Sequence, residues 1–171
     1  MDLDQSIFEN ADLLAATGVS ATTIQTWANR GILALSKKQQ NPGGGAKRLY
    51  SGLDIARIAA TNAFIARGLS TAAAGRIALR LERSRRTAEK WRKALDEPKP
   101  CVYVFVADAD VVDVYTGNDA RAALSHLTTL NEPAKGGVLG EATTVQMNVS
   151  CFDVGPEVYR AMQTLKKRKG E

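Results

Sequence analysis

The sequence contains few of the residues that build metal sites and disulfide frameworks. Its 171 residues include two cysteines and one histidine. Cys101 and Cys151 lie fifty positions apart with His126 between them, a spacing that matches no common zinc site. We therefore expect no bound metal. Each cysteine is interpreted as a small apolar strand residue, and a disulfide between the two is the alternative.

Long apolar runs and a secretory leader are also missing. The longest apolar segment, residues 101–107, is too short to span a bilayer. The start Met-Asp-Leu-Asp-Gln has neither the basic nor the apolar region of a signal peptide. We therefore expect a cytoplasmic protein without membrane contact. No catalytic constellation stands out, because Asp108, Asp110 and Asp113 are typical of a hairpin turn, and we expect no enzymatic activity and no cofactor.

Acidic residues are scarce in one half of the chain. Between Ser20 and Lys93 there are fifteen lysines and arginines against three acidic residues, whereas between Pro98 and Leu165 there are four against eight. The first half is therefore suited to a polyanion and the second is not. The final run Lys166–Lys169 is basic again, and we interpret it as the solvated last turn of a helix.

Residues 16–30 have the pattern of a helix, a sharp turn and a second helix. Gly18 permits the positive φ of the turn, and Ser20 is a typical cap for the helix that follows. In that helix Ile24, Trp27 and Ala28 share one face, which predicts that this face is buried. Uncharged hydrogen-bonding side chains, suited to base edges and phosphates, point outward: Thr22, Gln25, Thr26 and Asn29.

The segments on either side complete a winged arrangement. A short helix is predicted over residues 10–17, with Asn10 as its cap and with Leu13, Leu14 and Ala16 facing the core. Residues 32–35 and 48–50 are expected to form two short strands. The polar, glycine-rich segment between them is interpreted as a wing, over about residues 35–50, that follows phosphates.

Five fragments in this region resemble the sequential signature of the amino-terminal DNA-binding domain of the MerR family of bacterial transcription regulators. They are Thr17–Ser20, Gly31–Leu33, Lys47–Tyr50, Asp54–Ile58 and Arg67–Ser70, within about residues 7–81. The resemblance implies a winged helix-turn-helix that binds duplex DNA, usually as a dimer on a two-fold-symmetric site. It places the reading helix, about residues 21–30, in the major groove and the wing on the phosphate backbone.

The resemblance also assigns DNA-contacting roles to Thr22, Gln25, Thr26, Arg48 and Tyr50. The reading helix departs from the family because no arginine faces the groove, and a bidentate arginine is the commonest contact to guanine. We therefore expect phosphate contacts from the wing lysines and Arg48. The full predicted DNA-binding set is Ser20, Thr22, Gln25, Thr26, Asn29, Lys37, Lys38, Lys47, Arg48 and Tyr50.

The remainder of the chain is expected to differ from the family. Residues 71–96 are helical by composition, with too few apolar positions between Leu81 and Trp91 for a coiled coil. Pro98–Pro100 then interrupts the chain. The elements predicted beyond this point are strands over 101–107 and 111–115, a helix to about 130, a strand over 145–151 and a helix over 155–167.

These patterns predict an α+β fold. A mainly helical winged helix-turn-helix domain, residues 1–97, is followed by a small α+β module, residues 101–169, of order β-β-α-β-α with a three-stranded sheet. The predicted function is sequence-specific binding of double-stranded DNA by a bacterial or phage transcription regulator, as a homodimer joined through the C-terminal module. One alternative is an architectural DNA-binding factor of the excisionase or phage-packaging type, and another is a ligand or partner sensor tethered to DNA. The sequence identifies no small-molecule effector.

Overall fold

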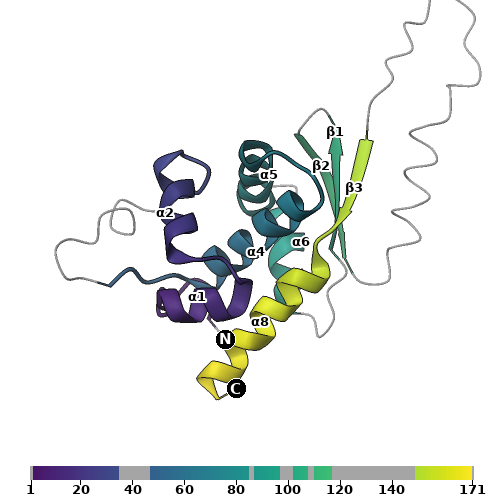
Figure 1. The fold of residues 1–171 in the computed structure, drawn as a ribbon. Coiled ribbons are helices and arrows are strands. Elements are labelled where there is room, and N and C mark those ends of the chain that lie inside the picture. Colours follow the sequence, from purple (N-terminus) through teal and green to yellow (C-terminus); the bar gives the residue numbers. More distant parts are fainter. Residues whose placement is uncertain are drawn as a thin grey trace, which may run out of the picture.

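The computed structural model describes residues 2–34, 47–84, 87–96, 102–107, 110–116 and 149–170. Most of this part of the chain is helical (Figure 1). Its elements, in order, are α1 (Asn10–Thr17), α2 (Ala21–Asn29), α4 (Gly52–Ala66), α5 (Thr71–Arg83), α6 (Ala88–Asp96), β1 (Val102–Ala107), β2 (Asp110–Thr116), β3 (Val149–Asp153) and α8 (Gly155–Lys169).

Helix α4 lies at the centre of the helical body. It begins at Ser51, whose hydroxyl accepts a hydrogen bond from the Asp54 backbone N–H, while the Asp54 carboxylate accepts one from the Ser51 N–H. This reciprocal cap is one that the sequence pattern Ser-x-x-Asp favours. Helix α4 packs against α1, α5 and α8, and most of its residues are buried. Helix α4 therefore connects the helix-turn-helix to α5 and α8 through one shared core.

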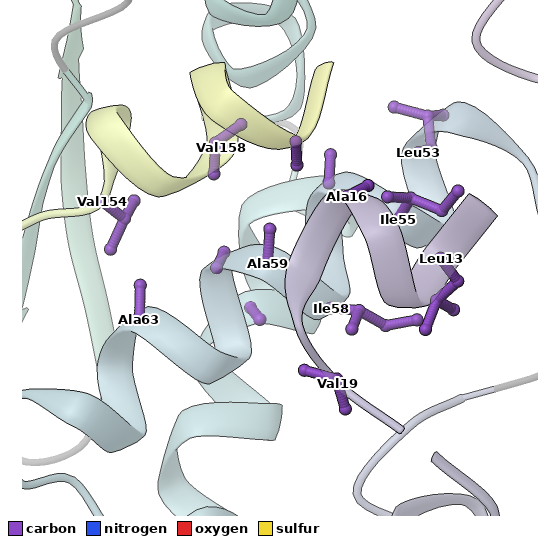
Figure 2. Close-up of a cluster of buried hydrophobic side chains, with 14 of the residues drawn as sticks. Leu13, Ala16, Val19, Leu53, Ile55, Ile58, Ala59, Ala63, Val154 and Val158 are labelled. Carbon is purple, nitrogen blue, oxygen red and sulfur yellow. The ribbon is translucent and has the colours of Figure 1, made fainter. Parts of the chain in front are cut away.

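The C-terminal helix α8 packs on this body. Its buried residues Val158, Ala161, Met162 and Leu165 recur at the spacing of one helical face, and that face lies against α1 and α4. Figure 2 shows Val154 and Val158 directed toward the α4 side chains Ala59 and Ala63. The small side chains of α4 let the two helices approach closely, so α8 belongs to the same hydrophobic core as the helix-turn-helix.

The predicted fold class, a helical domain followed by a self-contained α+β module, is therefore wrong. The described part of the chain is mostly helical, with six helices. No strand occurs within residues 2–34, 47–84, 87–96 and 154–170, which form the helical body. The helix predicted to close the C-terminal module instead covers α1 and α4, because its apolar stripe is complementary to their faces.

Three strands lie beside this body. They are antiparallel, in the order β2-β1-β3, with Tyr103 opposite Tyr115 on one side and opposite Asp153 on the other. The register shifts between Phe105 and Val106. Strand β2 contacts α5 and α6. The helix predicted between the second and third strands, ending near residue 130, lies outside the described residues.

The long helix predicted over residues 71–96 is interrupted. Helix α5 ends at Ser84, which is extended, with φ −71° and ψ 129°. The Thr87 hydroxyl then donates to the carbonyl oxygens of Arg80 and Leu81, at 3.1 and 3.2 Å, and α6 begins after it. Trp91 of α6 is completely buried.

Two local expectations at the amino-terminal side need correction. Glu9 rather than Asn10 caps α1, since the Glu9 N–H donates to the Asp12 carboxylate. Leu14 is 49% exposed instead of buried, because α8 and α4 cover only one side of this two-turn helix.

The strands expected around the wing are also absent from the residues described there. The backbone N–H of Ile32 donates to the Trp27 carbonyl at 2.8 Å, so the chain turns back beneath α2 instead of extending. Tyr50 pairs with Phe8 in an isolated bridge rather than with residues 32–35. The predicted division into residues 1–97 and 101–169 stays a prediction, since residues 97–101 lie outside the described part.

Candidate nucleic-acid interface

The turn between α1 and α2 is closed by local hydrogen bonds. Gly18 has φ 70°, and its N–H donates to the Leu14 carbonyl at 2.8 Å. The Thr17 hydroxyl accepts from the Val19 N–H at 3.1 Å, and the Ser20 hydroxyl accepts from the Thr23 N–H at the same distance. Val19 is buried beneath the turn. These contacts fix the angle at which α2 leaves α1, as the sequence predicted.

Helix α2 has one buried and one exposed face. Ile24, Trp27 and Ala28 are buried, which leaves the opposite side of the helix to solvent. Three of the predicted contact residues on α2, Thr22, Thr26 and Asn29, are exposed, while Gln25 is half-buried; Ser20, which caps the helix, is exposed as well. The helix therefore presents a polar, uncharged surface without an acidic residue.

The side chains on this surface are bonded to one another. Gln25 Nε2 donates to Asn29 Oδ1 at 2.7 Å, and the Thr26 hydroxyl donates to the Thr22 carbonyl at 3.0 Å. From outside the helix, Arg48 Nη2 donates to Gln25 Oε1 at 2.7 Å. Gln25, Asn29 and Arg48 thus form one hydrogen-bonded group, the reading group. Its Arg48 guanidinium lies beside a helix that has no arginine on its exposed face.

Lys47, at the base of the predicted wing, is held by the start of α1. Its ammonium lies 2.9 and 3.0 Å from the two carboxylate oxygens of Glu9. Both side chains are largely exposed, at 73% and 46%, so water screens the pair and its contribution to stability is small. Lys47 can exchange this carboxylate for a phosphate without leaving the surface.

Tyr50 is in the core. Its side chain is completely buried, its hydroxyl donates to Asn10 Oδ1 at 3.1 Å, and its backbone pairs with Phe8. Burial raises the pKa of the Tyr50 hydroxyl above its ordinary value of 10.0, and the neighbouring Arg48 guanidinium opposes that shift. In this conformation Tyr50 offers no surface to a DNA strand. It anchors the backbone from which Arg48 extends.

The described residues thus bring together Ser20, Thr22, Gln25, Thr26, Asn29, Lys47 and Arg48. Lys37 and Lys38 lie outside the described part of the chain. The link from Arg48 to Gln25, and the support from Glu9 and Asn10, were missed by sequence reasoning. No local pattern could have revealed the link, because Arg48 and Gln25 are 23 positions apart.

Two further findings concern sites of other kinds. Within the described residues, no group of three or more His, Cys, Asp and Glu side chains could hold a metal ion. None of the described helices is both long and apolar enough to cross a membrane.

Comparison with known proteins supports this arrangement. Residues 11–81 match the model of the MerR HTH family regulatory protein. The matched segment covers nearly all of α1, α2, α4 and α5. The resemblance predicted from the sequence is confirmed for this segment. Residues 11–81 are therefore similar to a family of helix-turn-helix regulatory proteins. No curated protein matches the chain.

Proposed function

We propose that the chain is a sequence-specific regulator that binds double-stranded DNA with α2 in the major groove and the wing on the phosphate backbone. Helix α2 supplies an exposed polar surface. Arg48, which bonds Gln25, supplies positive charge beside it, and Lys47 precedes Arg48 in the chain. The similarity of residues 11–81 to a helix-turn-helix regulatory family supports the proposal that these residues contact DNA. The predicted wing lysines Lys37 and Lys38 would add further phosphate contacts. We place this regulator in the cytoplasm of a bacterial or phage-infected cell.

The observation that carries this proposal is the 2.7 Å hydrogen bond from Arg48 to Gln25. A guanidinium has five N–H donors, and this bond occupies one of them. Because Gln25 fixes the position of the guanidinium, little side-chain entropy is lost when DNA binds. The reading group therefore couples a base-reading side chain to a phosphate-binding one.

A two-fold-symmetric site and a dimer form part of the same proposal. Two copies of α2, spaced one helical turn of DNA apart, read successive major grooves in helix-turn-helix dimers. The predicted dimer contact within residues 101–169 remains a prediction. Because the apolar face of α8 is buried against α1 and α4, such a contact would have to use other surfaces of that region.

An architectural role is the second candidate, and one observation favours it. Gln25 and Asn29 already bond each other, and Thr26 bonds its own helix backbone. Polar groups that already bond one another are less available to hydrogen-bond base edges. Recognition would then depend more on the shape of the DNA and on contacts with its phosphate backbone.

The experiment that tests the proposal is a binding titration of the full chain against a pool of random duplexes, followed by titration of the selected duplex and a shuffled one. We expect selection of one preferred site, bound roughly a thousandfold or more tighter than the shuffled duplex. We also expect affinity that falls steeply with salt. Equal affinity for both duplexes supports the architectural role instead, and no binding at low salt rules out both.

A further inference from the structure

The last turn of α8 contains four consecutive cations, Lys166–Lys169. Lys167, Arg168 and Lys169 are exposed, and the helix ends at Gly170, whose φ is 78°. A basic last turn stabilises a helix through its dipole, which is sufficient reason for such residues in a solvated tail. This turn, however, does not project into solvent like a tail, because it contacts the start of α1.

Helix α8 is fixed along its length. Its buried stripe ends at Leu165, directly before the basic turn, and lies against α1 and α4. Near its other end, Glu157 accepts hydrogen bonds from Arg67 at 3.0 and 3.2 Å. Figure 1 shows the C-terminal end of α8 beside α1. The cations therefore have a defined place on the surface of the helical body.

That place is the start of α1. Arg168 Nε lies 2.8 Å from Asp12 Oδ1, in the first turn of that helix. Lys169 Nζ lies 5.2 Å from the centre of the Phe8 ring, within the range of a cation–π contact. Two contacts from adjacent residues thus direct the last turn of α8 toward the segment Phe8–Asp12.

The same segment holds the base of the wing. Glu9 bonds Lys47, and Phe8 pairs with Tyr50. Lys47 adjoins Arg48, which bonds Gln25 on the exposed face of α2. A continuous series of contacts therefore runs from the reading group, through the wing base and the start of α1, to the end of α8.

We propose that the basic turn Lys166–Lys169 is a further phosphate-binding element of the same DNA site. This inference rests on the function proposed above. Arg168 is paired with Asp12 and anchors the turn, whereas no carboxylate among the described residues pairs with Lys167 or Lys169. Their ammonium groups are available to a phosphate backbone that extends beyond Lys47. Lysines bind phosphates as point charges, so this element adds affinity without reading sequence.

The test is the salt dependence of DNA binding by the full chain. Each phosphate that the protein neutralises contributes about 0.9 to the slope of log affinity against log salt concentration. The variant Lys167→Ala/Lys169→Ala should therefore have a slope shallower by about two. Its affinity should fall by the same factor for the selected duplex and for the shuffled one.

Two matched variants complete the design. Lys167→Arg/Lys169→Arg retains both charges and should keep the wild-type slope. Lys90→Ala/Lys93→Ala removes the same charge from α6 and should also leave the slope unchanged. Thermal melts of all the variants check that the fold is intact, since a role restricted to stabilising α8 would move the melting temperature and not the slope.

The outcomes separate the two proposals. Should the wild-type protein bind DNA while the α8 alanine variant keeps its slope, the basic turn is not a phosphate element and the proposed function stands. An equal loss of slope in the α6 variant would reveal a general charge effect and overturn the inference as well. Failure of the wild-type protein to bind at low salt overturns both.

Discussion

At the scale of single residues, Gly75 shows how closely the helices approach beneath the interface. A Cβ atom at this position would lie 2.5 Å from Ile32 Cγ2 and 2.6 Å from the Ile32 carbonyl oxygen. Ile32 directly follows the turn at the end of α2, so α5 supports the backbone that leaves α2. Only a residue without a Cβ allows this contact.

We predict that Gly75→Ala destabilises the protein. Alanine favours a helix by about 1 kcal/mol over glycine, but displacing a backbone carbonyl from a packed contact costs about 1–3 kcal/mol. The expected net loss, about 1 kcal/mol in the free energy of unfolding, is measurable by urea denaturation.

Gly52→Ala is the matched control. There an added Cβ would lie 3.0 Å from Leu3 Cδ2 and 3.3 Å from Leu3 Cα, a milder overlap than at Gly75, and we expect a smaller loss of stability. A Gly75→Ala protein as stable as the wild type would show that α5 does not support the turn in the way described.

Prediction from the sequence was most successful for residues whose environment is set locally. Gly18 and Ser20 have the roles expected of them, because a left-handed turn and a helix cap depend on their own backbone and the next few residues. Tyr50 and Gly75 could not be assigned in this way. Their surroundings, Asn10 and Ile32, are about forty residues away, and no periodic pattern connects such positions.

At the scale of elements, α8 is the clearest case of a predicted helix with an unpredicted neighbour. The spacing of its apolar residues and the proline in its first turn indicated the helix. Periodicity gives a buried face but does not identify the surface that covers it. The surface that covers α8 proved to be α1 and α4, and for this reason the predicted fold class is wrong.

We predict that Leu165→Ala destabilises the helix-turn-helix as well as α8. Leu165 is completely buried, and truncation of a buried leucine costs about 2–5 kcal/mol. Hydrogen exchange should therefore show faster exchange in α1 and α4 together with α8. Arg160→Ala, on the exposed side of α8, should leave these rates close to wild type. Faster exchange confined to α8 would contradict a shared core.

At the scale of the whole molecule, the chain brings cations from two distant segments, residues 47–48 and the end of α8, to the helix-turn-helix. The wing base, the reading helix and the end of α8 meet through Glu9, Gln25 and Asp12. The basic composition of residues 20–93 indicated a polyanion partner. Composition could not show that residues 168 and 169 contact the start of α1, because their position follows from the packing of α8.

We infer that Gln25 and Arg48 contact DNA as one unit. The most direct test is a double-mutant cycle on affinity for the selected duplex, with Gln25→Ala, Arg48→Ala and the double variant. Residues in contact show coupling energies of about 0.5–3 kcal/mol, whereas independent residues add within about 0.5 kcal/mol. We expect coupling in that range for this pair.

The cycle of Gln25→Ala with Lys47→Ala serves as the control, because Lys47 bonds Glu9, and it should be additive. Gln25→Ala alone should also relax base preference at one position of the site by about 1–3 kcal/mol. Strict additivity of the Gln25 and Arg48 substitutions, with base preference unchanged in every variant, would contradict the account.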